Sequence, residues 1–318
     1  MRVRFWGTRG SIPVALTSSD IRDKLAQALV QASGKTFASY EEAHAYATEE
    51  LDFSLTHTFG GHTPCVEIEL PGDEYYVCDM GSGARPFGVH VLAKQAKKPA
   101  TVNIFQSHVH WDHIMGFPFF GPSYVPGTKI RIHGCHDVLE HAYRLQQAAP
   151  CFPVEFDQLM ASVEFVKLEP GKPHEVAGVT VTPHLQLHSG DSYGYRFEKD
   201  GKAVVYTTDS EHKLEDRHEA ESFANFFRNA DIVIFDAMYA LAEAISVKAD
   251  WGHSSNIVGV ELCQMARAKH LVLFHHEPAN DDETLEGLLR EAQRFEELTR
   301  GDHALKVSAA YDGMEIDL

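Results

Sequence analysis

The sequence has few basic residues, and this shortage excludes one class of partner. Its 28 lysines and arginines stand against 46 aspartates and glutamates, which gives a formal net charge of −18. Proteins that hold long nucleic acids neutralise many phosphates with Lys and Arg side chains. We therefore do not expect a long nucleic acid as partner. A small phosphate ligand stays compatible with the charge, because metal cations can supply local positive charge.

The sequence also lacks paired cysteines and long apolar runs. Its cysteines are odd in number, and none stands in a C-x-x-C pair: Cys65, Cys78, Cys135, Cys151 and Cys263. They do not form a disulfide framework, and most are expected to be small buried side chains. The N-terminus reads as a strand and a turn rather than a signal peptide, and no segment approaches membrane-spanning length. We expect a cytoplasmic protein without membrane contact.

Nothing in the sequence resembles a linker. The chain has 318 residues, of which 44% are hydrophobic, and it shows no low-complexity tract or internal repeat. We therefore expect one domain over residues 1–318. Short apolar runs bounded by turns predict strands at Val3–Trp6, Cys65–Leu70, Tyr75–Cys78, Val102–Phe105, Lys129–His133, Val163–Val166, Val179–Thr182, Tyr193–Phe197, Ala203–Thr207, Ile232–Phe235 and Leu271–Phe274.

Helical patterns occur in an early insertion and near the C-terminus. Ile21, Leu25 and Leu29 recur every four residues, and Ser39 begins a capping box. They belong to residues 15–57, which interrupt β-type segments, so we expect a helical insertion that is a lid, a dimer contact or mere decoration. Later helices are expected from about 257 to 267 and around 285–295. Strands and helices together predict the α/β class, with sheets covered by helices.

Histidine is unusually frequent, with 20 residues, several of them clustered. The apolar run that ends at Phe105 leads into an H-x-H-x-D-H motif formed by His108, His110, Asp112 and His113. Imidazole suits Zn²⁺, and a carboxylate can join it. His108 and His110 can face one ion, and Asp112 and His113, further along the loop, can reach a second. The alternative is a solvated His-rich loop, which would not need this mixture at this spacing.

This motif resembles the metal-binding motif of the metallo-β-lactamase superfamily. The resemblance covers most of the chain, with residues 15–57 as the main departure. It implies an αββα sandwich, in which two mixed β-sheets pack face to face with helices outside. The segment Gly7-Thr8-Arg9-Gly10-Ser11 resembles the opening of the phosphodiesterase branch, and Asp79 matches a strand-end aspartate expected beside a metal ligand.

The resemblance assigns a third histidine to the first ion. His188 precedes a turn and Gly194-Tyr195, which is similar to the third-histidine motif of tRNA 3′-processing endonucleases and their phosphodiesterase relatives. His184 is the rival, because residues four apart share a face of a strand. The downstream Gly-Tyr pair favours His188.

Two further ligands follow from the same resemblance. Asp209 ends an apolar run and resembles the family's bridging aspartate, although an aspartate that caps a turn is the alternative. His275 directly follows an apolar run and is assigned to the second ion. His276 is its rival, but consecutive side chains of an extended chain point in opposite directions. We therefore expect His276 to orient a ligand.

The resemblance thus implies two divalent ions. The ligand set is His108, His110 and His188 for one ion, Asp112, His113 and His275 for the other, and Asp209 for both. Zinc fits these ligands best, and manganese or iron is also compatible. Some diiron relatives have Glu where this chain has His110, so His110 favours hydrolysis. Two ions roughly 3.5–4 Å apart can bind a bridging hydroxide, which suits cleavage of a phosphodiester, thioester, lactone or β-lactam.

His253 narrows the expected reaction. It lies in Trp251-Gly252-His253-Ser254-Ser255, before a predicted helix whose N-terminus favours anions. Its position resembles an extra histidine of the phosphodiesterase branch, which contacts phosphate and protonates the leaving oxygen. An incidental histidine in a capping loop is the alternative. We predict Asp112 and His253 as catalytic residues.

The expected function is metal-dependent hydrolysis of a small or cyclic phosphodiester by a metal-bridging hydroxide. The charge of −18 and the lack of a Gly-rich basic arm argue against tRNA as substrate. The alternatives are a lactone or thioester hydrolase of the same fold and a metal-containing sensor without turnover. The resemblance also implies that a homodimer is compatible with the fold.

Overall fold

The computed structural model describes residues 1–212, 216–244 and 251–318, and these form two seven-stranded β-sheets. The first has the order β14 (Glu315–Asp317), β1 (Arg2–Gly7), β2 (Cys65–Glu69), β3 (Glu74–Cys78), β4 (Thr101–Phe105), β5 (Lys129–Gly134) and β6 (Ser162–Lys167). The second has the order β13 (Lys306–Ala309), β12 (His270–Phe274), β11 (Ile232–Asp236), β10 (Lys202–Thr207), β9 (Ser192–Lys199), β8 (Val179–Gln186) and β7 (His174–Val176).

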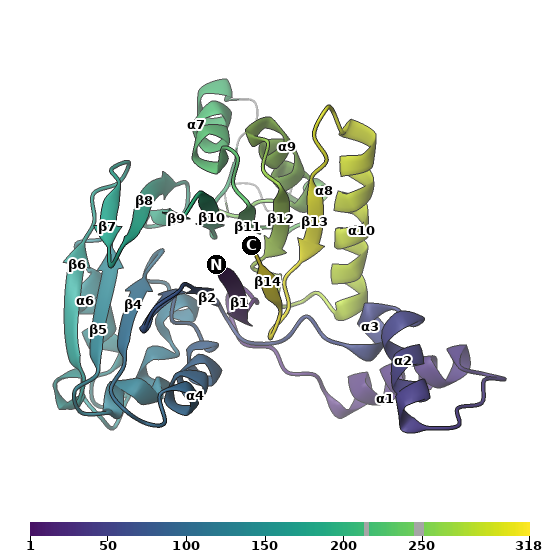
Figure 1. The fold of residues 1–318 in the computed structure, drawn as a ribbon, viewed down its shortest axis with the longest axis horizontal. Coiled ribbons are helices and arrows are strands. Elements are labelled where there is room, and N and C mark those ends of the chain that lie inside the picture. The colour runs from purple at the N-terminus through teal and green to yellow at the C-terminus, as the bar shows by residue number, and fades with distance from the viewer. Residues whose placement is uncertain (213–215, 245–250) are drawn as a thin grey trace.

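The two sheets pack face to face, and helices cover their outer faces (Figure 1). Buried side chains from both sheets meet between them, among them Phe5, Phe105, Tyr195 and Phe274. A second core lies under α7 (Arg217–Phe227), α9 (Asn256–Ala266) and α10 (Asp282–Thr299), and a third lies under α4 (Ala84–Lys94) and α6 (Leu139–Gln146). The predicted αββα sandwich is confirmed.

Both sheets contain parallel strands, and this brings distant loops to one edge. In the second sheet β10, β11 and β12 are parallel neighbours, and in the first sheet β3, β4 and β5 are parallel. The carboxyl ends of parallel strands lie at the same edge of a sheet, where ligands bind in many α/β folds. The loops that follow Phe105, Thr207 and Phe274 therefore leave from this edge.

The strands were predicted more completely than the helices. Each predicted strand is present within one or two residues of its expected bounds, except that β8 runs on to Gln186. The structure adds the short strands β7, β13 and β14 and the helices α4, α6 and α7, which the sequence pattern did not reveal. β14 pairs with β1, so the two ends of the described chain share a sheet.

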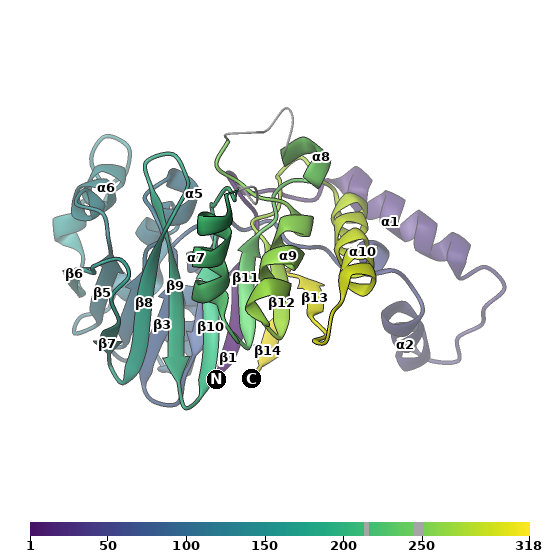
Figure 2. The same cartoon turned by 90° about the horizontal axis from the view of Figure 1, so that it is seen from above.

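Residues 15–57 are helical, as expected. They contain α1 (Ser18–Gln31), α2 (Tyr40–Glu49) and a short α3 (Phe53–Thr56). Figure 2 shows α1 and α2 beside α10, outside the sandwich. We call residues 15–57 the helical arm. Among the helices that the structure describes, none combines the length and the apolar character that crossing a bilayer requires.

Candidate metal centre

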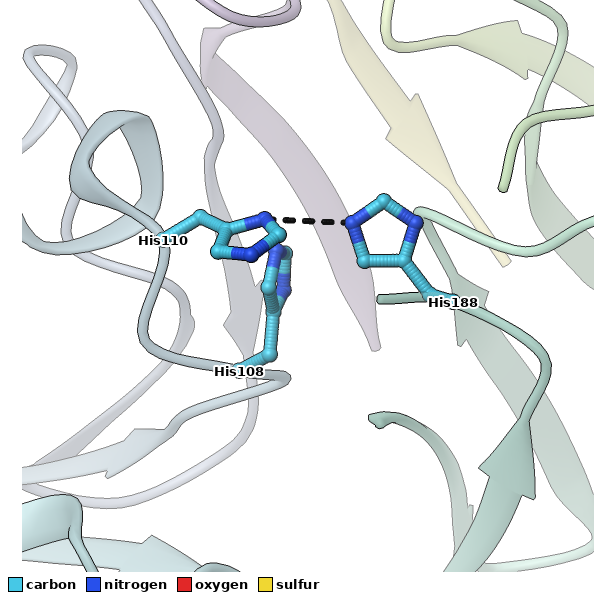
Figure 3. A group of neighbouring side chains, drawn as sticks. All are labelled: His108, His110 and His188. Carbon is cyan, nitrogen blue, oxygen red and sulfur yellow. Dashed lines mark hydrogen bonds between the residues drawn. The ribbon is translucent and has the colours of Figure 1, made fainter. Parts of the chain in front are cut away.

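Three predicted ligands converge on one point from two loops. His108 and His110 come from the loop between β4 and α5 (Trp111–Ile114), and His188 comes from the loop after β8 (Figure 3). One ring nitrogen from each lies within 4.8 Å of the others. The Nδ1 atom of His110 and the Nε2 atom of His188 are 3.1 Å apart. His184 lies elsewhere, hydrogen-bonded to Ser222 and stacked on Phe226.

A second group forms beside the first. It consists of Asp112 and His113 on α5 and His275 after β12, again with ligand atoms within 4.8 Å of one another. The Oδ2 atom of Asp112 is 3.2 Å from Nε2 of His113 and 3.5 Å from Nε2 of His275. These side chains are buried. The structure thus brings together the residues that the sequence assigned to the second ion.

The carboxylate of Asp209 lies between the two groups. Its Oδ2 atom is 3.6 Å from Nε2 of His108 and 3.7 Å from Nε2 of His188. Its Oδ1 atom is 3.1 Å from Nε2 of His113 and 3.2 Å from Nε2 of His275. Each oxygen therefore faces one group of histidines. This is the placement that an aspartate shared by two ions requires.

The chemistry of these side chains fits divalent metal ions. The Nε2 atoms of His108, His113 and His275 are buried and have no hydrogen-bond partner among the described residues, although such buried polar atoms normally have one. Burial, with the nearby His113 and His188, lowers the pKa of His108 well below its usual value, although Asp209 acts in the opposite sense. A neutral ring offers a lone pair to a metal. Imidazole and carboxylate together suit zinc.

Asp79 holds the side chains that the first sheet contributes to the centre. Its Oδ2 atom lies 2.7 Å from Nδ1 of His113 and accepts hydrogen bonds from the hydroxyls of Ser107 and Tyr206, both at 2.7 Å. Its Oδ1 atom accepts from the side chain of Gln106. This network fixes the ring of His113 with Nε2 directed at Asp209. The predicted place of Asp79, beside a ligand, agrees with the structure.

Other backbone contacts hold Asp112 and His275. The backbone nitrogen of Ser11 donates to Oδ2 of Asp112 at 2.8 Å, and the hydroxyl of Thr63 donates to the backbone oxygen of Asp112 at 2.7 Å. A Cβ atom on Gly10 would lie 2.6 Å from the ring of His275. The N-terminal loop therefore packs directly against the centre, and Gly10 allows this close approach.

His188 and His253 are linked through Gly252. The Nδ1 atom of His188 is 2.8 Å from the backbone oxygen of Gly252, which directs Nε2 toward His110. Gly252 has φ +79°, and a Cβ atom there would lie 2.4 Å from the His188 ring. Only glycine meets both requirements.

His253 lies at the centre and is held by an aspartate that the sequence analysis missed. Its Nδ1 atom is 2.8 Å from Oδ2 of Asp236, and its ring stacks on His275 with centroids 5.1 Å apart. Burial lowers the pKa of His253, but Asp236 more than offsets this effect and raises it to about 9. Asp236 ends an apolar strand just as Asp209 follows one, so the same signal could have identified it.

His276 lies outside the metal centre. Its Nε2 atom is 2.8 Å from the backbone oxygen of Ala310, and its ring packs edge-on against Phe59. Burial lowers its pKa to about 3, so it is a neutral, buried anchor between β12 and the loop after β13. Our expectation that His276 orients a ligand has no support in these contacts.

Three residues of the centre adopt a backbone conformation that L-amino acids avoid. Asp79, Asp209 and His275 have φ values of 59°, 49° and 59°. Such conformations cost on the order of 1–3 kcal/mol and cluster at functional sites, where the surrounding structure enforces them. All three residues follow a strand directly or within two positions. The strand ends thus turn sharply and direct these side chains toward one another.

Comparison with known proteins identifies the family of this chain. The family described as "Beta-lactamase superfamily domain" matches residues 79–276. Ribonuclease Z of Staphylococcus haemolyticus (strain JCSC1435) is 26% identical over 140 residues, which are 42% of this chain and 42% of that protein. The alignment therefore spans less than half of that relative.

Two solved structures share the fold over almost the whole chain. The metallo-beta-lactamase fold protein YhfI from Bacillus subtilis has a TM-score of 0.66 and 18% identity, covering 99% of this chain and 98% of that one. A diphosphatase from the PhnP family has a TM-score of 0.59 and 18% identity, covering 100% and 97%. Because the family match spans more than half of its residues, the chain belongs to the beta-lactamase superfamily domain family and has the metallo-β-lactamase fold.

Proposed function

We propose that this protein is a metal-dependent hydrolase that cleaves a small or cyclic phosphodiester. The observation that carries the proposal is the placement of His253 against the two groups of predicted ligands. Its Nδ1 atom is bonded to Asp236, which leaves Nε2 available to hold a proton near the reacting atoms. A phosphodiester has a leaving oxygen that needs such a proton.

Two divalent ions would be held by the residues described above. His108, His110 and His188 would bind one, Asp112, His113 and His275 the other, and Asp209 both. When bound, such a pair supplies a nucleophile at neutral pH and stabilises charge on the attacking and leaving oxygens. Zinc suits the donor set best, and manganese or iron is the alternative.

The side chains of this protein contribute positioning and proton transfer. Ser11 and Thr63 fix Asp112, which we propose as catalytic through its place in the centre. Asp236 fixes the ring of His253 through Nδ1. A proton on Nε2 would therefore point away from Asp236 in a fixed orientation. Gly252 shapes the backbone between His253 and His188. These contacts favour a preorganised site.

The names of relatives support phosphate ester chemistry, and composition supports a small substrate. Ribonuclease Z and a diphosphatase both act on phosphate linkages by name. The net charge of −18 disfavours a long polyanion such as tRNA. A compact diester makes fewer demands on positive surface, because the metal ions neutralise its single charge.

Hydrolysis of bis(p-nitrophenyl) phosphate by zinc- or manganese-loaded protein tests the proposal. We expect release of nitrophenol by the wild type and loss of this activity in Asp112→Asn. Cyclic nucleotides and a precursor tRNA would then be compared as substrates. No release with either metal contradicts phosphodiester cleavage. In that case lactones and thioesters, and then ligand binding without turnover, are the alternatives to measure.

A further inference from the structure

The metal centre opens to solvent beside His110. This histidine is exposed, whereas five other predicted ligands are buried: His108, Asp112, His113, Asp209 and His275. The ring of His110 faces that of His188, and Nδ1 of His110 lies 3.1 Å from Nε2 of His188 (Figure 3). The rings of His110 and His188 therefore mark the side from which a substrate reaches the centre.

Two exposed tryptophans flank this opening. Trp111 directly follows His110 at the start of α5, and it is 65% exposed. Trp251 directly precedes Gly252, whose backbone oxygen lies 2.8 Å from Nδ1 of His188, and it is 58% exposed. Trp111 comes from the loop after β4 of the first sheet, and Trp251 comes from the segment before α9, between two strands of the second sheet. The two tryptophans therefore reach the opening from different sheets.

Such exposure is unusual for tryptophan. The chain has three tryptophans, and this residue type is highly buried on average in proteins. Trp6 is partly buried, donates a hydrogen bond to Oε2 of Glu67 at 3.0 Å and packs against the ring of Phe87. The other two expose more than half of their surface, and both lie beside contacts of the metal centre. Large apolar side chains gathered at a functional site indicate a surface that a ligand covers.

We propose that Trp111 and Trp251 bind a planar aromatic ring on one arm of the substrate. This inference rests on the proposed function, because the rest of a diester bound at the centre must extend through this opening. An aromatic side chain stacks on flat rings with little regard to their substituents, as in proteins that bind single-stranded nucleic acid. The ring would lie outside His110, with the phosphate toward the metal centre. The substrate class is then narrowed from small diesters to diesters with an aromatic arm.

Charge at the opening favours a neutral ring over a second anionic group. The carboxylate of Glu211 accepts a hydrogen bond at 3.1 Å from the backbone nitrogen of Gly252, the residue next to Trp251. A second phosphate on the substrate would meet this carboxylate as well as the net charge of −18. A neutral aromatic ring is not repelled in this way, because stacking requires no basic residue.

The two tryptophans also favour a ring over an aliphatic arm. Leucine or isoleucine would cover an aliphatic arm equally well, whereas a flat indole is matched to a flat partner. Stacked aromatic pairs contribute binding energy beyond that of the area they bury. A nucleobase and a substituted phenyl ring share this chemistry, so both are compared as substrates.

Steady-state kinetics of three diesters tests the proposal. One carries a nucleobase (3′,5′-cyclic AMP), one carries phenyl rings (bis(p-nitrophenyl) phosphate), and one has no aromatic ring (methyl ribofuranoside 3′,5′-cyclic phosphate). Trp111→Leu and Trp251→Leu should each lower the ratio of kcat/KM for a ringed substrate to kcat/KM for the ring-free one by about 5- to 100-fold, mainly through KM. A general loss of activity cancels in this ratio, and the substrate with the larger fall identifies the ring. Tyr40→Leu is the control, since it removes a 75% exposed aromatic ring from the helical arm and should leave the ratio unchanged.

Binding without turnover separates this inference from the proposed function. AMP and phenyl phosphate should quench the tryptophan fluorescence of the zinc-loaded protein far more than ribose 5-phosphate, which has the phosphate but no aromatic ring. Trp111→Leu should weaken this binding about fivefold or more, while circular dichroism and zinc content check that the variant is folded and loaded. Ring-dependent binding without cleavage of any diester contradicts the proposed function and keeps the aromatic site. Cleavage of diesters with an unchanged ratio in both tryptophan variants, or no quenching by either ringed ligand, overturns the aromatic site.

Discussion

The Nδ1 atom of His113 lies 2.7 Å from the Oδ2 atom of Asp79, and both side chains are fully buried. Burial lowers the pKa of His113, but Asp209, Asp112 and Asp79 together outweigh it and raise the pKa well above its usual value. The surrounding carboxylates thus favour positive charge at this ring. A metal ion bound at Nε2 of His113 would supply that charge. The contact between His113 and Asp79 therefore supports the metal centre, although Asp79 is not itself a predicted ligand.

We predict that Asp79→Asn weakens metal binding by about 10- to 100-fold, as loss of a carboxylate behind a histidine ligand commonly does. The amide keeps the shape of the side chain but removes its charge. Titration of metal-free protein with zinc against a competing chelator measures the effect. Tyr206→Phe is the control, since it removes one hydrogen bond to Asp79 and keeps the carboxylate. Unchanged affinity in Asp79→Asn would show that His113 does not bind the ion.

A second prediction concerns Asp209, whose two oxygens face different groups of histidines. Asp209→Ala should lower the number of bound zinc ions from two to one or none, because it removes an oxygen from each proposed ion. Metal analysis of protein after dialysis measures this number. The exposed Asp191, which directly precedes β9 and lies outside both groups of histidines, supplies Asp191→Ala as control. Two tightly bound ions in Asp209→Ala would rule out a shared ligand at this position.

A third prediction separates proton donation by His253 from metal binding. His253→Gln should lower kcat by roughly 10²- to 10⁴-fold for a diester with a poor leaving group. It should have a much smaller effect on bis(p-nitrophenyl) phosphate, because nitrophenolate leaves without a proton. Asp236→Asn should show the same pattern in weaker form, since Asp236 acts through His253.

Zinc content should stay unchanged in both variants. Equal losses of kcat on the two substrates would assign His253 a structural role.

Most of the predicted ligands could be located from the sequence because they follow strong apolar runs, whereas His188 was assigned from the Gly194-Tyr195 pair that follows it. Phe105 and Phe274 end buried strands, and the histidines behind them could be read directly. The fold of the sheets was predictable for the same reason. α4 was missed because its sequence contains Pro86 and Gly88, which disfavour helices, and β14 because it has only three residues.

The orientation of α1 could not be predicted from its pattern. Ile21, Leu25 and Leu29 correctly indicated a helix, but such a stripe normally marks the buried side. Here the stripe faces water, because Lys24 is bound to Asp282, which is 258 positions further along the chain. Contacts over this separation leave no periodic signal. Asp236 was missed for another reason. It ends an apolar run, as a predicted ligand could, but its partner His253 was assigned only by resemblance, so nothing in the sequence linked the two residues.

The last prediction concerns acid stability and depends on His212. Its ring stacks on Phe235 and meets Phe223 edge-on, and neither ring nitrogen has a hydrogen-bond partner among the described residues. Burial, with a smaller effect of His184, lowers its pKa to about 3. The unfolded chain takes up a proton at this histidine below about pH 6.5, whereas the folded chain does not until about pH 3.

The contribution of His212 to stability is therefore complete above pH 6.5 and falls as the pH is lowered toward 3. The loss is about 1.4 kcal/mol per pH unit, or about 3 kcal/mol between pH 6.5 and pH 4. His212→Leu removes this proton uptake and should flatten the pH dependence of the free energy of unfolding by that amount. Urea denaturation of both proteins at pH 7.5 and at pH 4.5 measures it. His212→Leu also removes two unpaired polar atoms from an aromatic environment. At pH 7.5 the free energy of unfolding should therefore fall by no more than the cost of any cavity that the smaller side chain leaves. Parallel pH profiles for the two proteins would mean that folding does not lower the pKa of His212.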